Sequence, residues 1–368
     1  MIEKGKIGVR QFTVLVLMYT LGTAVIILPS LTASYAHANA WITMVIAMLI
    51  GIGIVFMLNC VISIDWKKNL FELSEHILGK WVGKAVSVLF LTYILLLTAT
   101  NLRQIGEFIT TQVTVETPIQ FVMFIFMMTS LIGVRLGLEV IGRTSEIFFP
   151  YAFTSLILLL ILVAPEADFR NVQPVLQEDI GGTFLAVIPT LTTPYLELFI
   201  FLAIFPYVHR FKPAKKAFYI GVIIGSVILT LITLMCLAVL GPDFTARQIF
   251  PSYILGKKIS LANFLERIEI LVAIAWFFTI FFKITLNFYV LNLGMSHFFN
   301  LKSTKTLSTP LAFIIIIMGI ILFTDIIYYN EFVAYYAPYY SATIGILLPM
   351  LLLLVGFIRK KKKKSKVG

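Results

Sequence analysis

The chain has 368 residues, of which 60% are hydrophobic and 13% are charged, whereas a soluble domain carries roughly 25% charged residues. Its apolar residues form long uninterrupted runs, and about twenty such residues are enough for a helix to cross a bilayer. This composition excludes an ordinary soluble domain and predicts an all-α polytopic membrane protein. The net charge of +11 does not indicate nucleic-acid binding, because the basic residues lie between the apolar runs and in the C-terminal tail.

Ten apolar segments predict ten transmembrane helices in a single integral membrane domain that covers residues 1–368. Continuous apolar composition favours helices over the strands of a β-barrel, which alternate at period two. The predicted spans are residues 12–34, 39–63, 82–111, 119–135, 144–163, 183–206, 214–240, 264–297, 310–328 and 334–357.

Basic residues alternate between the two sides of this predicted bundle. Most of the 29 basic residues lie on the side of the N-terminus, in every second loop, and in the tail at 358–368. The positive-inside rule then places both termini in the cytoplasm. The tail is interpreted as an anchor on anionic membrane lipids, with a specific lipid or protein site as the alternative.

The first and sixth spans are each interrupted near the middle. The stretch LGTAVIILPS contains Gly22 and Thr23 and then Pro29, and the stretch PTLTTPYLELF contains Pro189 and Pro194. Glycine permits non-helical backbone, and proline removes a backbone donor. Each interruption alone is typical of an ordinary kink. As a matched pair they indicate a ligand site of the kind found in transporters with broken helices.

The spacing of the two broken spans also predicts an internal repeat. The sixth span follows the first by five helices, and an odd number of helices per repeat inverts the second copy. The sequence therefore predicts a 5+5 inverted repeat, with repeat one at about 11–163 and repeat two at about 183–357.

Charged residues inside the predicted spans are costly and usually functional. Glu197 follows the break of the sixth span, while Lys283 lies deep in the eighth span with Asn287 one turn later. The two charges either neutralise each other or complement the two ends of a bound amino acid. Arg103 and Glu107 have the spacing of an intrahelical pair, and an external vestibule or plain structural pairing are equally open for them.

Tyrosines that flank the last two predicted spans do not indicate a particular function, and the sequence lacks common catalytic motifs. Six tyrosines favour an interfacial belt: Tyr328, Tyr329, Tyr335, Tyr336, Tyr339 and Tyr340. No HExxH motif, phosphate loop or nucleophile elbow is present. Cys60 and Cys236 fall in separate apolar runs and match no metal-binding spacing. We therefore expect no catalytic residues, metal or cofactor, and the chain is predicted not to be an enzyme.

Five short motifs occur in a characteristic order along the whole chain, namely LGTAVIILPS, GKWVGK, TPIQ, QPVL and ERIEILVAIAW. With the ten predicted spans, this order resembles the B subunit of the GerA-type nutrient germinant receptors of spore-forming bacteria. That family belongs to the amino acid/polyamine/organocation superfamily, whose members have a LeuT-like inverted-repeat fold.

The resemblance implies a membrane subunit that binds a small nutrient germinant, usually an amino acid, and triggers germination. Its implied partners are the receptor A subunit and a C lipoprotein, in the lipids of the spore inner membrane. It also implies a ligand site among the first, third, sixth and eighth spans, with the substrate-binding candidates Gly22, Thr23, Leu97, Asn101, Tyr195, Glu197, Leu198, Lys283 and Asn287. Lys283 stands where sodium-coupled relatives form a sodium site, so its ammonium group is expected to replace that ion.

Two other functions are compatible with the same sequence. An autonomous amino-acid transporter or proton-coupled symporter could use Glu197 as a proton carrier. A structural scaffold with a vestigial pocket is the third reading. Fold alone does not separate receptor from transporter.

Overall fold

The computed structural model describes residues 5–173, 180–258, 268–323 and 326–364, and within them nearly all regular structure is helical. The helices are α1 Val9–Leu21, α2 Ala24–Ala36, α3 Ala40–Ile62, α4 Leu70–Leu78, α5 Lys80–Phe108, α6 Ile119–Leu136, α7 Leu138–Val163, α8 Ile180–Leu185, α9 Val187–Thr192, α10 Phe201–Ile204, α11 Phe211–Leu240, α12 Pro242–Arg247, α13 Pro251–Lys258, α14 Glu269–Phe298, α15 Lys305–Ile321, α16 Ile326–Glu331, α17 Ala337–Ala342 and α18 Leu348–Lys364. Short 3₁₀ or π segments join several of them.

Eight helical stretches in the described residues are long and apolar enough to cross a membrane. One of them, Ala24–Ile62, joins α2 to α3, and it turns at His37, whose φ is 45°. Two shorter apolar helices, α1 and α15, accompany these eight stretches. The chain is therefore an integral membrane protein, and each of the ten predicted spans overlaps described helix. The predicted start of the eighth span, with Glu266 and Arg267, lies outside the described residues.

The first predicted span is divided into α1 and α2 at Gly22 and Thr23, which cap the two helices. Pro29 does not break the span, because α2 continues through it. The sixth predicted span is divided into α8, α9, a 3₁₀ segment at Leu196–Ile200 and α10. Its α9 ends at Thr192, immediately before the Thr193-Pro194 pair. Both interruptions predicted from the sequence are therefore present.

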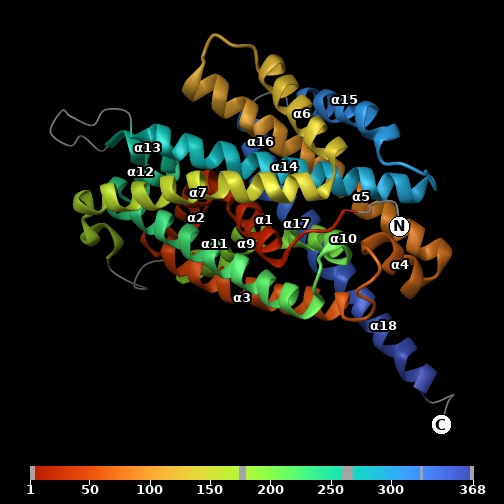
Figure 1. The fold of residues 1–368 in the computed structure, drawn as a ribbon. Helices are drawn as coiled ribbons and strands as arrows, with labels where there is room; N and C mark the ends of the chain where they lie inside the picture. The colour runs from red at the N-terminus through yellow and green to blue at the C-terminus, as the bar shows by residue number, and fades with distance from the viewer. Residues whose placement is uncertain (1–4, 174–179, 259–267, 324–325, 365–368) are drawn as a thin grey trace.

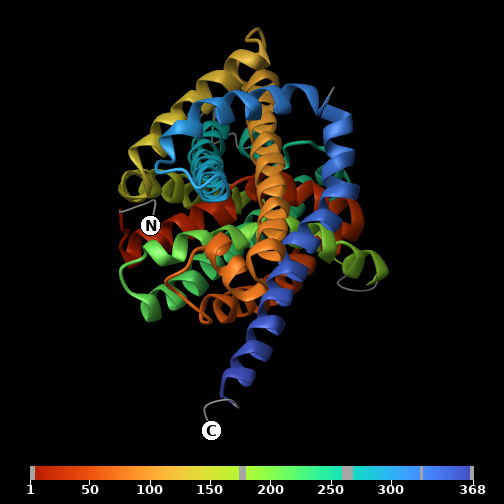
Figure 2. The same ribbon diagram turned by 90° about the vertical axis from the view of Figure 1, so that its right-hand side faces the viewer.

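The two broken segments lie at the centre of the bundle. In Figure 1 the long helices α3, α7, α11 and α14 run across the molecule in similar directions, with α1, α9 and α10 between them. Helix α1 packs against α11, α14 and α7. Figure 2 shows α5 crossing the front of the bundle beside the last, blue segment. The broken helices are thus surrounded by continuous ones, which hold the breaks away from lipid.

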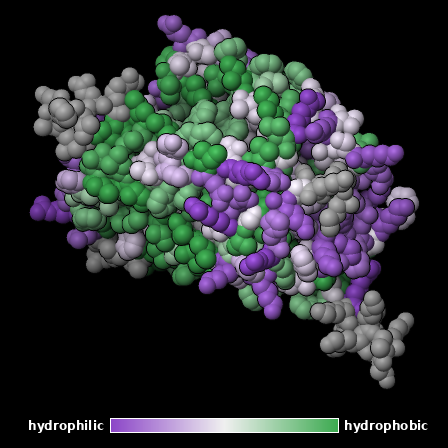
Figure 3. All heavy atoms as spheres, viewed as in Figure 1, coloured by the Kyte–Doolittle hydropathy of each residue, from purple (hydrophilic) through white to green (hydrophobic). Residues whose placement is uncertain are grey.

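The two ends of the bundle differ in their surface. One end, called here the open end, carries α12 and α13, and the other, called the closed end, carries the N-terminal segment and α4 (Figure 1). Figure 3 shows hydrophobic residues over much of the middle, while hydrophilic residues gather towards the closed end. An apolar band with polar residues at its ends is the surface expected of a bilayer-spanning bundle.

Candidate functional site

A buried ion pair lies between the two broken segments. The Nζ atom of Lys283 on α14 is 2.7 Å from Oε2 of Glu197, and their side chains are 0% and 5% exposed. Glu197 lies in the 3₁₀ segment that follows the break of the sixth predicted span. A single charge in this position would be strongly unfavourable, whereas a close pair with further hydrogen bonds is tolerated. The structure therefore brings together the two charges that the sequence placed in separate spans.

The same lysine connects both helix breaks. Its ammonium group donates to Oγ1 of Thr23 at 3.0 Å and to the carbonyl oxygen of Thr193 at 3.3 Å. Thr23 follows the break of the first predicted span, and Thr193 lies in the break of the sixth. A helix break leaves backbone groups without intrahelical partners. Here a fixed cation supplies one partner for the broken backbone, and it joins α14 to both interrupted segments.

Asn287 and Tyr19 extend this network away from the breaks. The Tyr19 hydroxyl donates to Oδ1 of Asn287 at 2.8 Å, and both residues are buried. Nζ of Lys283 lies 5.1 Å from the centre of the Tyr19 ring, within the range of a cation–π contact. Lys283 and Asn287 are four residues apart on α14, so they face the same side of that helix. The same face of α14 therefore contacts Tyr19 of α1 twice, through the ammonium group of Lys283 over the ring and through the amide of Asn287 at the hydroxyl.

Gly22 is required because Lys283 approaches the backbone closely. A Cβ atom at Gly22 would collide with Cδ of Lys283 and lie 2.9 Å from the carbonyl oxygen of Tyr19. Real Cβ contacts are not this short, so a larger residue would displace the lysine or the break. The glycine is thus explained by packing as well as by the freedom of its backbone.

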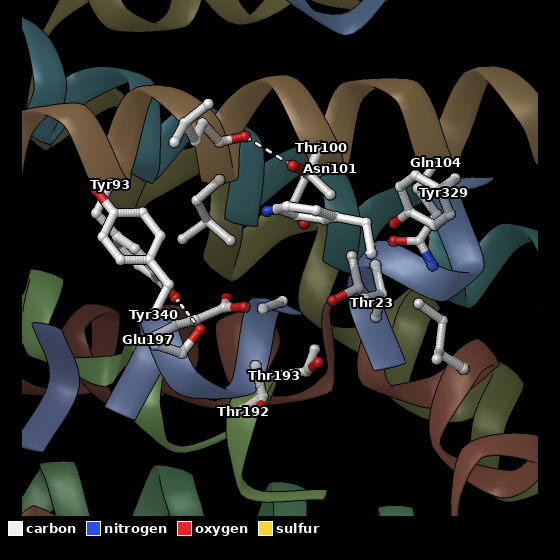
Figure 4. Close-up of a pocket in the computed structure, with 17 residues that line it drawn as sticks. Thr23, Tyr93, Thr100, Asn101, Gln104, Thr192, Thr193, Glu197, Tyr329 and Tyr340 are labelled. Carbon is white, nitrogen blue, oxygen red and sulfur yellow. Dashed lines mark hydrogen bonds between the residues drawn. The ribbon is translucent and has the colours of Figure 1, made fainter. Parts of the chain in front are cut away.

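A cavity of about 50 Å³, lined by both polar and apolar side chains, lies directly beside the ion pair, and it has room for a few water molecules. Figure 4 shows Asn101 and Gln104 on its α5 side, and Glu197, Thr192 and Thr193 on the opposite side. Its lining residues are Thr23, Ile27, Tyr93, Leu96, Leu97, Thr100, Asn101, Gln104, Thr192, Thr193, Glu197, Tyr329, Phe332, Val333, Ala337, Tyr340 and Ser341. The cavity is therefore bounded by both broken segments, by α5 and by the last predicted span.

A second cavity, of about 220 Å³, continues the first towards the open end. The two cavities share Ile27, Gln104, Tyr329 and Val333 in their linings. The larger one is also lined by residues 246–250, which form the end of α12 and its connection to α13. We call this larger cavity the vestibule, and the four shared residues form the neck between it and the cavity.

The opposite side of the breaks is packed. Ile7 donates its backbone N–H to the Tyr207 carbonyl at 2.9 Å and accepts from the His209 N–H at 3.1 Å. These bonds tie the chain before α1 to the chain after α10. Below the breaks, the ring of Phe12 packs edge-on against Phe205 at 4.9 Å between centroids. The broken helices are thus joined at the closed end and border a cavity at the open end.

The predicted ligand-binding residues fall into three groups. Thr23, Leu97, Asn101 and Glu197 line the cavity. Gly22, Lys283 and Asn287 lie behind it, in the network that joins α14 to α1. Tyr195 and Leu198 are buried and do not line it. The Tyr195 hydroxyl instead donates to Ser226 on α11 at 2.8 Å.

Two parts of the cavity lining were not among the predicted site residues. The segment from α16 to α17 contributes Tyr329, Val333, Ala337 and Tyr340, of which only Ala337 and Tyr340 lie in the last predicted span. Their spacings of four, four and three residues fit one helical face. The sequence pattern had favoured an interfacial belt for these tyrosines. Tyr329 is buried, whereas Tyr335, Tyr336 and Tyr339 are exposed. On α5, the cavity also includes Thr100 and Gln104, which continue the face of Leu97 and Asn101.

Arg103 and Glu107 form a buried pair within α5, in which Nε of Arg103 is 2.7 Å from Oε1 of Glu107. Neither residue lines the cavity or the vestibule. Of the two possibilities for this pair, the structure shows intrahelical pairing.

Comparison with known proteins gives one family and a shared fold. A family model described as "Spore germination protein" matches residues 6–329. Spore germination protein KB of Bacillus subtilis (strain 168) is 29% identical over 370 residues, which cover 100% of this chain and 98% of that protein. A second relative, spore germination protein YndE of the same strain, is 25% identical and covers 98% of each chain.

Solved transporter structures share the architecture at low sequence identity. Mhp1, a nucleobase-cation-symport-1 family transporter in a closed conformation with bromovinylhydantoin bound, aligns with a TM-score of 0.72 and 14% identity, over 95% of this chain and 78% of its own. MhsT in complex with L-phenylalanine aligns with a TM-score of 0.60 and 14% identity, over 95% of this chain and 97% of its own. The predicted transporter-like helical fold is therefore confirmed. The 5+5 inverted repeat and its boundaries stay a prediction.

Proposed function

Because the chain belongs to the spore germination protein family, we propose that it is the nutrient-sensing membrane subunit of a spore germination receptor. It binds a small nutrient germinant, with an amino acid as the expected class, beside the helix breaks and thereby triggers germination. The observation that carries the proposal is the Lys283–Glu197 pair, which joins both breaks at the wall of the cavity. A ligand that enters this cavity competes directly for the contacts that hold the broken helices together.

The proposed mechanism is a shift of population between two arrangements of the breaks. An amino acid carries an ammonium and a carboxylate, so it can replace each partner of the ion pair in turn. Since Lys283 also holds Thr23 and Thr193, a change at the pair alters the position of both broken segments. The function requires binding and movement rather than catalysis, so we propose no enzymatic activity and no cofactor.

The proposed topology is ten transmembrane helices in two inverted repeats of five, with both termini in the cytoplasm. The basic residues Lys67, Lys68 and Lys80 flank α4 at the closed end, beside the N-terminal segment, and support this orientation (Figure 1). Membership of the family supports placement in the spore inner membrane. It also supports assembly with a receptor A subunit and a C lipoprotein, the partners to which the movement would be transmitted.

The second candidate function is an autonomous amino-acid transporter or proton-coupled symporter. It is favoured by the fold shared with transporters and by a buried carboxylate, that of Glu197, which reaches the cavity. As a symporter, the chain would carry the proton on Glu197. The contacts that join the broken helices at the closed end would separate in a later step of the transport cycle.

The test is germination of spores that lack only this chain, measured against single amino acids, sugars and nucleosides. Loss of the response to one nutrient class, with other triggers intact, is the expected result for a receptor. Unchanged germination would contradict it. Saturable, concentrative uptake by the purified chain alone in proteoliposomes would instead favour the transporter.

A further inference from the structure

Two amide side chains in the cavity have unused hydrogen-bonding capacity. Asn101 and Gln104 are 3% and 2% exposed. Within the described residues, Nδ2 of Asn101 and both Nε2 and Oε1 of Gln104 have no hydrogen-bond partner. Buried polar atoms in folded proteins are nearly always paired, and exceptions call for an explanation. Because the residues are three apart on α5, their amides lie on the same face of that helix.

Both amides lie where a ligand must pass or rest. Asn101 lines the cavity, and Gln104 lies in the neck that joins it to the vestibule. Figure 4 shows the amide of Gln104 beside Tyr329, and Asn101 further along the same helix. A ligand that enters from the open end therefore meets Gln104 first and Asn101 next.

Several other polar groups of the cavity lining already have partners. The Thr100 hydroxyl donates to the Leu96 carbonyl at 2.8 Å. The hydroxyls of Tyr93 and Ser341 are 2.7 Å apart and bond to each other. Among the residues of the described chain that line the cavity, Glu197 is the one with a carboxylate, and it is already paired with Lys283. Apart from Oε2 of Glu197, which lies 2.7 Å from Nζ of Lys283, the buried cavity-lining side-chain atoms without a hydrogen-bond partner in the described residues are the uncharged amide atoms of Asn101 and Gln104.

We propose that Asn101 and Gln104 determine ligand specificity by binding an uncharged polar group that both donates and accepts hydrogen bonds. Carboxamides and clustered hydroxyls have this chemistry, so the ligand is an amide-bearing amino acid or a polyol such as a sugar. The inference rests on the proposed function of this site.

The physical basis is discrimination against ligands that cannot form these bonds. Water supplies partners to the amides when the cavity is empty. A carboxamide or hydroxyl group replaces that water without loss, whereas an aliphatic group would leave the amides unpaired and buried. Sites built to hydrogen-bond a ligand reject analogues that lack the matching group by large factors.

The experiment compares Gln104→Leu with Thr98→Val in spores that contain the complete receptor. Leucine removes both functional atoms of Gln104 at similar size. Thr98 is a matched control, because it is buried on the same helix, donates to the Ile94 carbonyl of that helix at 2.6 Å, and lines neither the cavity nor the vestibule. Germination is measured against asparagine and glutamine, against glucose and inosine, and against alanine and valine. Protein levels are checked by immunoblot.

We expect the wild-type receptor to respond either to asparagine and glutamine or to glucose and inosine. The nutrients that work show whether the two amides recognise a carboxamide or hydroxyl groups. In Gln104→Leu the half-effective concentration of that nutrient should rise about tenfold or more, and in Thr98→Val it should stay within about twofold. A receptor that responds only to alanine or valine, or that is unaffected by Gln104→Leu at normal protein level, would overturn the inference while leaving the receptor function intact.

Failure of the proposed function gives a different result, namely unchanged germination when the whole chain is deleted. The inference is then decided by the thermal stability of the purified full-length chain with the same six compounds. Stabilisation by a carboxamide or polyol that is lost in Gln104→Leu supports it, and its absence refutes it.

Discussion

The two ends of the broken helices are built in opposite ways. At the closed end, backbone hydrogen bonds join Ile7 to Tyr207 and His209, and the Phe12 ring packs into aromatic neighbours. At the open end the same helices border a cavity and a vestibule. The Lys283–Glu197 pair lies between these regions. The difference separates two tasks, because the packed end fixes the position of the helices, whereas the hollow end can accept a ligand and move.

The largest expected effect comes from disrupting the Lys283–Glu197 pair, which lies between the two regions. Lys283→Met leaves the carboxylate of Glu197 buried without its cation, and losing one partner of a buried pair typically costs about 3–5 kcal/mol. We expect much less chain in the membrane and no nutrient response. The measurement is the amount of full-length chain in spore membranes, together with its thermal unfolding in detergent.

A double variant provides the control for this prediction. Lys283→Met with Glu197→Leu removes both charges, and replacing a whole buried pair by apolar groups is often nearly neutral. The double variant should therefore regain protein level but not the response. A single variant as stable as wild type would show that the pair does not hold the breaks.

The next prediction compares one apolar residue from each region. Phe12 is fully buried at the closed end, so Phe12→Ala should lower the free energy of unfolding by about 3 kcal/mol or more. Leu97 faces the cavity, so Leu97→Ala should cost about 1 kcal/mol or less but alter the nutrient response. Thermal unfolding of both purified variants tests the contrast. Equal losses of stability would mean that the open end is packed as tightly as the closed end.

This contrast also explains what the sequence could and could not predict. The helices and the two breaks followed from composition, because apolar runs and the Gly22 and Pro194 positions act locally. The pairing of Glu197 with Lys283 was a hypothesis from charge alone. The free-energy cost of burying a charge in the membrane indicates that each residue needs an oppositely charged partner, but it does not identify which residue that partner is. The closed end left no sequence signal, because it depends on contacts between distant segments.

The cavity lining was only partly predicted for the same reason. Glu197 and Thr23 were found because a carboxylate or a break is unusual inside a span. Tyr329 and Gln104 were missed because tyrosine is common at membrane interfaces and one amide near a helix end is unremarkable. Tyr195 was implied as a site residue by the family resemblance, yet the irregular backbone after α9 directs its hydroxyl to Ser226.

A smaller effect is expected from Glu197→Gln, which keeps the shape and one hydrogen-bond acceptor for Lys283 while removing the negative charge. We expect a smaller loss of protein than in Lys283→Met, because the amide oxygen still accepts from Lys283. The half-effective nutrient concentration should rise about tenfold, since a hydrogen bond to a charged group is worth about 1.5–3 kcal/mol. Dose–response curves of spore germination provide the measurement. A variant that responds at wild-type nutrient concentrations would remove Glu197 from the binding site.

The smallest expected effect concerns sodium. The ammonium of Lys283 already contacts Thr23, Thr193 and Glu197, so the boundary between the two regions holds a fixed cation of its own. A second cation there would be repelled by it. Replacing sodium by potassium or choline at constant ionic strength should therefore change the half-effective nutrient concentration by less than about twofold. If the affinity for the nutrient rose steadily with sodium concentration, the ammonium of Lys283 would have to leave this position when the ligand binds. The Lys283–Glu197 pair would then move together with the open end.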